Sequence, residues 1–221
     1  MNVNANNAYA KASAPYETDD LPPSYEASQE ASSHTEQEQT TELKFEEIIN
    51  KYEISRLFSQ KLGILASFKI VFIFDDSGSM NSTLNDSPLN TNTFKATRWE
   101  ELQEFAKISI EIANVFNKEG VDVHFLNRQS VRNVKTINDL AYLLEKKPSG
   151  YTPLNKILKK VLSESNIPST KKLLVLIVTD GEPTDDRGQE DIYGFKQSLM
   201  QRNAKTYTTI VSCTGILLIA I

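Results

Sequence analysis

Two continuous apolar runs dominate the hydrophobic pattern of this chain, and a polar loop directly follows each of them. They are FKIVFIF at 68–74 and LLVLIVT at 173–179, which are rich in β-branched residues and contain little polar alternation. Runs of this length and composition are typical of strands that are covered on both faces. Further strands are expected at 121–126, 130–135 and 207–213.

Apolar positions recur at helical spacing between these strands. The longest such segment starts after Thr97, a residue type that caps helices, and is closed by Gly120. Other helices are expected from Phe45 to a stop at Gly63, and at 136–145, 153–165 and 190–202. The alternation of strands and helices predicts an α/β fold with a doubly wound, mainly parallel sheet and helices on both faces.

The composition changes near residue 44. Residues 1–44 contain no Phe, Ile or Trp, and their eight acidic and two lysine side chains give a net charge of −6. Such a segment cannot bury enough apolar surface to offset the entropy of ordering it. We therefore expect a disordered acidic tail at 1–44 and one domain at 45–221.

The overall composition narrows the functional classes. With 221 residues, 39% hydrophobic and 24% charged, the chain resembles an ordinary globular protein, and its charge of −5 argues against a nucleic-acid partner. The single cysteine, Cys213, excludes an internal disulfide and a cysteine-based zinc site. The apolar stretch at 208–221 is shorter than the ~20 residues of a membrane span, and no signal-peptide pattern occurs. A cytoplasmic location is expected.

Three polar loops are expected near the carboxyl edge of the sheet, where ligands bind in open α/β folds. Asp75, Ser77 and Ser79 form an Asp-x-Ser-x-Ser motif after the first long strand, Asp180 follows the second, and Thr152 precedes a helix. Oxygen ligands without His or Cys suit a hard divalent cation, Mg²⁺ first, with Mn²⁺ or Ca²⁺ as alternatives.

The hydroxyl groups of this set suggest what the metal would bind next. Hydroxyls are neutral ligands, so the ion keeps a net positive charge and can accept an external carboxylate in its open position. A protein ligand with an exposed acidic residue is therefore the expected partner.

At these residues the sequence resembles a known family. FIFDDSGSM, GYTPL and LIVTDGEPTDD, in this order, are similar to the three pieces of the metal-ion-dependent adhesion site of von Willebrand factor A domains. The resemblance covers about residues 45–212 and is closest to intracellular A domains of fungi and protists. It implies the strand order 3-2-1-4-5-6 and the following ligands for Mg²⁺: Ser77 and Ser79 directly, Thr152 directly or through water, Asp75 and Asp180 through water.

Alternatives to this interpretation exist for individual residues. Ser, Gly and Asp after a strand often only cap a helix or form a turn, although three concurring loops outweigh that explanation. The family commonly has Gly where this chain has Tyr151, which would narrow the approach to Thr152. Asp76 is expected to be a solvated or loop-bracing carboxylate. Three further acidic residues are expected to be solvated turn residues: Glu182, Asp185 and Asp186.

An enzyme of the metal-dependent hydrolase class is the rival hypothesis. It would need a second carboxylate pair and a base, for which only Asp76 and Glu182 are candidates. Neither His34 in the tail nor His124 within a strand is assigned a catalytic role, and the nucleotide-binding glycine motifs are absent. We therefore expect a binding module and no enzyme activity.

The tail contains one short motif, formed by Pro22, Pro23 and Tyr25. It resembles the Pro-Pro-x-Tyr ligand through which adaptors bind WW domains and recruit HECT-type ubiquitin ligases, because paired prolines favour the polyproline II conformation. An adaptor role is the corresponding expectation.

The C-terminus departs from the family. A full A domain continues after the strand at 207–213 with another strand and one or two helices, so the chain is expected to be C-terminally truncated, with the last strand and helix missing. The strand would then be an apolar edge that residues 216–221 cover imperfectly or leave free. Low stability and self-association are expected to follow.

Overall fold

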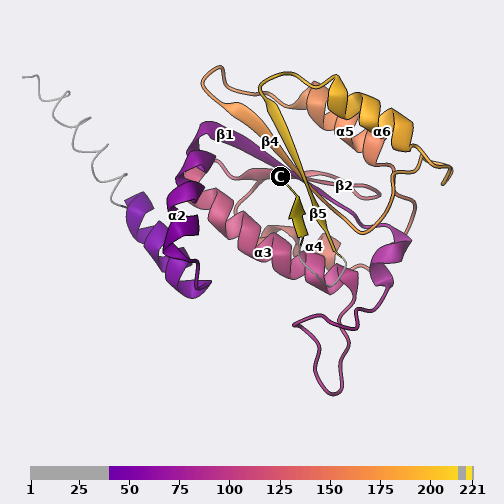
Figure 1. Ribbon diagram of the computed structural model, residues 1–221, viewed down its shortest axis with the longest axis horizontal. Coiled ribbons are helices and arrows are strands. Elements are labelled where there is room, and N and C mark those ends of the chain that lie inside the picture. The colour runs from indigo at the N-terminus through magenta and orange to yellow at the C-terminus, as the bar shows by residue number, and fades with distance from the viewer. Residues whose placement is uncertain (1–39, 214–217, 221) are drawn as a thin grey trace, which may run out of the picture. The chain divides into compact units, whose positions relative to one another are not determined.

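A six-stranded sheet forms the centre of the part of the chain that the computed structural model describes, residues 40–213 and 218–220 (Figure 1). Its order is β3-β2-β1-β4-β5-β6. The four central strands run parallel to one another, and each of the two edge strands, β3 and β6, is antiparallel to the strand beside it. The bounds are β1 Phe68–Phe74, β2 Val121–Phe125, β3 Val131–Val134, β4 Lys172–Thr179, β5 Thr206–Ser212 and β6 Leu218–Ala220. The predicted α/β class with a mainly parallel sheet is confirmed.

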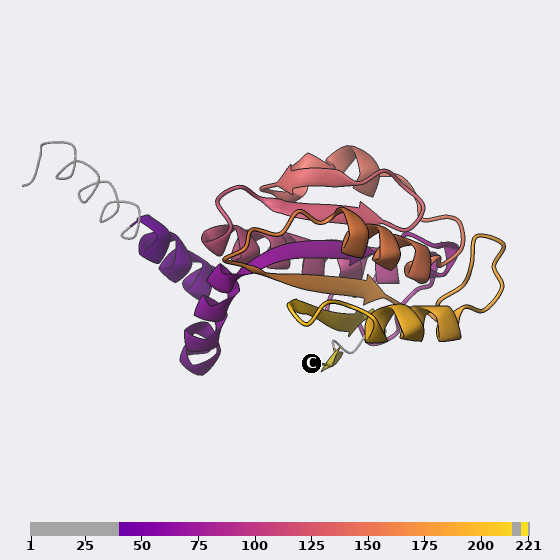
Figure 2. The same ribbon diagram turned by 90° about the horizontal axis from the view of Figure 1, so that it is seen from above.

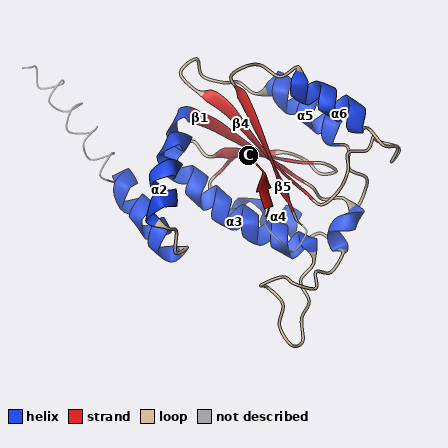
Figure 3. Ribbon diagram, viewed as in Figure 1, coloured by secondary structure: helices blue, strands red, loops and turns tan. Residues whose placement is uncertain are grey.

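Helices lie on both sides of this sheet, with α3 on one side and α5 and α6 on the other (Figures 2 and 3). The α-helical bounds are α2 Arg56–Leu62, α3 Arg98–Phe116, α4 Ala141–Leu144, α5 Leu154–Glu164 and α6 Ile192–Met200. Short 3₁₀ segments occur at Gly63–Ser67, Gly78–Asn81 and Ile137–Leu140. Helical residues 40–51 precede α2.

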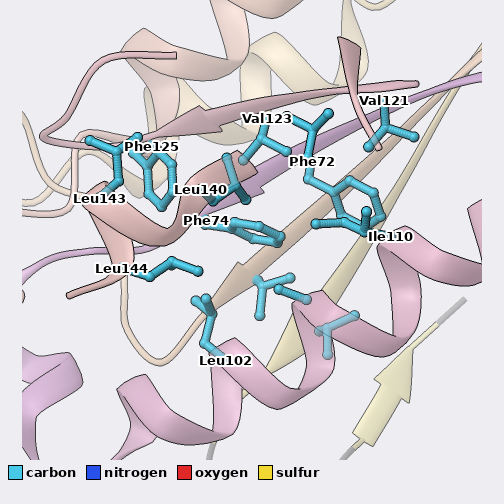
Figure 4. Close-up of a cluster of buried hydrophobic side chains, with 14 of the residues drawn as sticks. Phe72, Phe74, Leu102, Ile110, Val121, Val123, Phe125, Leu140, Leu143 and Leu144 are labelled. Carbon is cyan, nitrogen blue, oxygen red and sulfur yellow. The ribbon is translucent and has the colours of Figure 1, made fainter. Parts of the chain in front are cut away.

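The central strand β1 is buried on both faces, as its uninterrupted apolar run predicts. Phe72 and Phe74 pack into a cluster with residues of α3, whereas Val71 and Ile73 belong to a second cluster with residues of α5 and α6. Figure 4 shows the first cluster, in which Leu102 and other α3 residues face the aromatic rings of β1 and β2. Alternate side chains of one strand thus hold two helical layers, and the strand ends are placed by this packing.

The single helix expected from Phe45 to Gly63 is wrong. The helical residues 40–51 end before Glu53, which has a positive φ of 50°, and α2 starts after Ser55. The break has a local cause, because the side chain of Ser55 accepts a hydrogen bond from the amide of Phe58 and so caps a new helix. Gly63 caps α2 as expected.

Other element boundaries differ by a few residues. The N-cap of α3 is Thr97, as predicted, and its capping box with Glu100 is complete, but the helix ends at Phe116. Gly120 lies in the following turn at φ 93°, where a Cβ atom would come within 2.5 Å of the backbone of Asn133. The helix expected at 136–145 is a 3₁₀ turn followed by the short α4.

The edge beside β5 is partly covered. Leu218–Ala220 pairs antiparallel with β5 at three positions, opposite Ser212, Val211 and Ile210. In the described residues, no strand pairs with this side of β5 between Thr206 and Thr209. Of the two expectations for residues 216–221, the described part therefore agrees with an incomplete cover.

Two expectations concern other parts of the chain. The Pro22–Pro23–Tyr25 motif and most of the proposed tail lie outside the described residues, while residues 40–44 are helical. No helix in the described ranges is both long and apolar enough to cross a bilayer.

Candidate metal site

The first loop of the predicted site is shaped by Asp75, at the end of β1. Its Oδ1 accepts a hydrogen bond from the backbone amide of Ser77 at 2.8 Å, and its Oδ2 accepts one from the hydroxyl of Thr179 at 2.5 Å. The chain then enters the 3₁₀ segment Gly78–Asn81, which brings the Oγ atoms of Ser77 and Ser79 to 3.0 Å from each other. Asp75 therefore ties the ends of β1 and β4 together and presents the two hydroxyls.

The third loop adds Asp180, which follows β4 directly. Its Oδ1 accepts a hydrogen bond from the hydroxyl of Ser79 at 2.8 Å, and its Oδ2 pairs with Nη1 of Arg98 at 2.5 Å. The side chain of Asp180 is completely buried, and that of Arg98 is 29% exposed. Two loops more than 100 residues apart in the sequence thus meet in one continuous group of oxygens.

The second loop reaches the first through its backbone. The amide of Gly78 donates to the carbonyl of Gly150 at 3.0 Å, and the amide of Ser149 donates to the carbonyl of Asp76 at 2.8 Å. Thr152 is buried, and its amide donates to the hydroxyl of Thr184 in the third loop at 3.0 Å. The three predicted loops are therefore brought together as one structural unit.

Four of the five predicted metal-site residues form the connected group: Asp75, Ser77, Ser79 and Asp180. Thr152 belongs to the same unit, but within the described chain no hydrogen bond links its hydroxyl to the two serines or to Asp180. Its side chain is thus buried in the same unit without being part of the hydrogen-bonded group. Tyr151 packs on the third loop, where a Cβ on Gly188 would come within 2.5 Å of its ring.

The oxygen spacing suits a hard divalent cation. Ligands about 2.0–2.1 Å from an octahedral Mg²⁺ lie about 2.9 Å from one another, whereas those of an octahedral Ca²⁺ site lie about 3.4 Å apart. The observed separations are 3.0 Å between Ser77 Oγ and Ser79 Oγ, and 2.8 Å between Ser79 Oγ and Asp180 Oδ1. Both separations are ordinary hydrogen-bond lengths, so the three oxygens lie close enough to contact one hard divalent cation, either Mg²⁺ or Ca²⁺.

Hydroxyls outnumber carboxylates among the possible metal ligands. In the described residues, no cluster of three or more His, Cys, Asp or Glu side chains has the arrangement of a metal site. A site of this kind would thus combine two hydroxyls with Asp180, and Asp75 would act by holding the first loop.

Burial makes the negative charge at Asp75 costly. Burial raises the pKa of the Asp75 carboxyl above its ordinary value, the hydrogen bonds from Ser77 and Thr179 oppose this, and the nearby charge of Asp180 raises it further. Two neighbouring carboxylates in a buried place favour a nearby positive charge. Cys213 lies close enough to feel the same charges, and burial raises the pKa of its thiol to about 12, so it is an unreactive thiol.

Asp76 is buried, so the expectation of a solvated carboxylate is wrong and that of a loop-bracing one is correct. Its Oδ1 accepts a hydrogen bond from the amide of Asn127 at 2.8 Å, and its Oδ2 lies 3.1 Å from Nε of Arg128. The same guanidinium donates to three carbonyls that precede the second loop: Leu143, Lys146 and Lys147. Burial raises the pKa of Asp76, although Asn127 and Arg128 counteract it.

The remaining acidic residues behave as turn residues. Asp185 accepts hydrogen bonds at 2.8 Å from the amides of Arg187 and Gln189, and Asp186 forms an exposed pair with Lys156 at 2.9 Å. Glu182 is exposed.

Sequence reasoning missed Arg98, Asn127 and Arg128. Asn127 and Arg128 come directly after the strand predicted at 121–126, so their place at the carboxyl edge was available as a signal. The sequence signal for Arg98 is weaker. This residue directly follows the predicted cap Thr97, but only the packing of α3 brings it to Asp180.

Comparisons with known proteins add no further assignment. No protein-family model matches the chain, and a search of curated proteins finds no similar sequence. The likeness to von Willebrand factor A domains therefore remains a prediction that rests on the three motifs.

Proposed function

We propose that this protein is a Mg²⁺-dependent binding module of the von Willebrand factor A type, which engages a carboxylate of a partner protein without turnover. The observation that carries the proposal is the continuous group formed by Ser77 Oγ, Ser79 Oγ and Asp180 Oδ1, with separations of 3.0 and 2.8 Å. The strand order of the sheet, which equals the order that the resemblance implies, supports the doubly wound arrangement.

The chemistry follows from the charge of the ligands. A bound Mg²⁺ would supply an electrophilic position for an anionic ligand atom. Ser77 and Ser79 would contribute neutral oxygens, and Asp75 would hold the backbone of Ser77 in place through its 2.8 Å hydrogen bond. Because the two serine oxygens are neutral, the ion would remain more attractive to an external carboxylate than an ion held by carboxylates alone.

The rival hydrolase lacks support from the environment of its candidate base. Both carboxylate oxygens of Asp76 face protein groups, Asn127 on one side and Arg128 on the other, and the side chain is buried. A general base needs access to the water or substrate proton that it removes. Glu182, the other candidate, is exposed, and within the described residues no hydrogen bond links it to Ser79 or Asp180.

Metal titration of the full chain tests this proposal. Isothermal titration calorimetry with Mg²⁺ or Mn²⁺ should show one site in the wild type, and Ser77→Ala and Asp180→Ala should weaken it by at least about tenfold, since even outer-shell changes cost 10–100-fold. Ser82→Ala is the matched control, because Ser82 is an exposed serine just outside the group.

Two results would count against the binding module. One is an absence of metal affinity in the wild type, or equal affinity in the Ser77 and Asp180 variants. The other is hydrolysis of a generic phosphate or ester substrate that disappears in the same variants, which would favour the enzyme class.

The adaptor role of the tail is a separate part of the proposal, and it rests on the Pro22, Pro23 and Tyr25 motif. A synthetic peptide of residues 17–30 is expected to bind WW domains, and Tyr25→Ala should abolish the binding because the tyrosine ring fills the recognition groove. Fluorescence anisotropy measures this directly. Unchanged binding of the alanine peptide would show that the motif is coincidental.

A further inference from the structure

Arg98 places a positive charge directly beside the candidate metal site. Its Nη1 lies 2.5 Å from Asp180 Oδ2, while Asp180 Oδ1 accepts the hydrogen bond of Ser79. The carboxylate of Asp180 therefore lies between the guanidinium and the hydroxyl pair. A divalent cation bound at the hydroxyls would share Asp180 with Arg98.

The position of Arg98 is fixed by the local fold. It is the first residue of α3, and its backbone amide donates to the carbonyl of Ser82 at 3.0 Å. The preceding Thr97 forms a capping box with Glu100. The backbone that carries the guanidinium is therefore held by a capped helix start.

A cation at this position does not stabilise the helix itself. The first turn of a helix carries a partial positive charge, so acidic side chains are favoured there and basic ones are disfavoured. The Nε atom of Arg98 is also buried with no hydrogen-bond partner in the described structure. Burying an unsatisfied donor costs free energy. The arginine is thus better explained by its effect on Asp180 than by helix stability.

The charge count shows what that effect would be. With both carboxylates ionised, Asp75 and Asp180 would neutralise a bound Mg²⁺ completely. Arg98 offsets one of these negative charges, so the loaded group would keep a net charge of +1. A positively charged site attracts an anion, whereas a neutral one does not.

From this geometry we infer that Arg98 is a charge-balancing residue, which lowers the affinity of the site for its metal and raises the affinity of the loaded site for a carboxylate. The inference rests on the proposed function, and it adds the residue that makes an acidic ligand favourable. Asp180, which Arg98 contacts, remains the oxygen donor.

The effect of Arg98 on metal affinity is tested by Mn²⁺ titration of the full chain, with free Mn²⁺ measured by electron paramagnetic resonance. Arg98→Gln and Arg98→Met remove the charge and should bind Mn²⁺ about tenfold more tightly than the wild type, because a like charge near the ion is gone. Arg98→Lys keeps the charge and should bind as the wild type does. A merely structural role predicts the opposite, namely weaker binding in all three variants.

The effect of Arg98 on carboxylate affinity is tested by acetate binding to the Mn²⁺-loaded protein, which water proton relaxation measures. Acetate should displace metal-bound water at a several-fold higher concentration in Arg98→Gln than in the wild type or Arg98→Lys. Equal or weaker Mn²⁺ affinity in both neutral variants would overturn this inference alone, as would unchanged acetate binding. No Mn²⁺ binding by the wild type would overturn the proposed function together with it.

Discussion

At the carboxyl ends of β1 and β4, three loops are joined by directional polar contacts, whereas the sheet face between α2, α3 and β5 is lined by apolar side chains. In the first region, Asp180 is contacted from two other segments, through Ser79 and Arg98. Asp75 is contacted from one, through Thr179, and Asp76 from one, through Asn127 and Arg128. In the second region, a cavity of about 200 Å³ is bordered by side chains that include Phe58, Leu174 and Thr209.

The difference lies in how strongly each region determines its own geometry. A buried carboxylate tolerates few arrangements of its donors, because every unsatisfied oxygen costs free energy. Apolar contacts are not directional, so a partly open apolar face can repack at a modest cost. We therefore expect the loops to be intolerant of single substitutions and the apolar face to be tolerant of them.

The largest effect is expected for Arg128→Ala. Arg128 is only 11% exposed, and its Nε is the sole group within ion-pair distance of the fully buried Asp76 Oδ2 in the described structure. Removing it takes the countercharge from a buried carboxylate that keeps only hydrogen bonds from Asn127, and breaking a buried ion pair in this way typically costs about 3–5 kcal/mol. The cation–π contact with the Trp99 ring, 4.9 Å away, is lost as well. Urea unfolding measures the change.

Arg132→Ala is the matched control for this substitution. Arg132 pairs with Glu164 at 3.7 Å, but both side chains are about half exposed, so its loss should cost less than about 1 kcal/mol. If both variants lose the same free energy of unfolding, the buried contacts of Asp76 contribute no more to stability than an exposed ion pair does.

The smaller effect is expected for Phe58→Gln at the apolar face. The side chain of Phe58 is 50% exposed, so about half of the ~2 kcal/mol of a fully buried aromatic residue, or about 1 kcal/mol, should be lost. Leu102→Ala, on α3 and completely buried, is the contrasting control and should cost about 2–5 kcal/mol. The same urea experiment compares them.

Protein concentration sharpens this second test. The stability of a monomer does not depend on concentration, whereas self-association through the apolar face would make it do so. Phe58→Gln could lose more free energy of unfolding than Leu102→Ala, or its loss could grow with protein concentration. Either result would show that the apolar face is buried in an assembly, and the predicted contrast between the two regions would be wrong.

The sequence by itself determined five of the six strands described, the order of the polar loops along the chain, and most of the oxygen donors. The run at 68–74 predicts a strand buried on both faces, and β1 is Phe68–Phe74 with its side chains divided between two clusters. Thr97 predicts the start of α3. These signals are local, because periodicity and capping depend on residues only a few positions apart.

Only the tertiary structure decided which side chains surround those donors. The arginine at position 98 reaches Asp180 across 82 residues of sequence, and Arg128 reaches Asp76 across 52. The break of the first helix at Glu53 also escaped the periodic pattern, since residues before and after it keep helical spacing. Pairings of this kind depend on how helices and strands pack, and the energy of a buried charge depends on everything that excludes water from it.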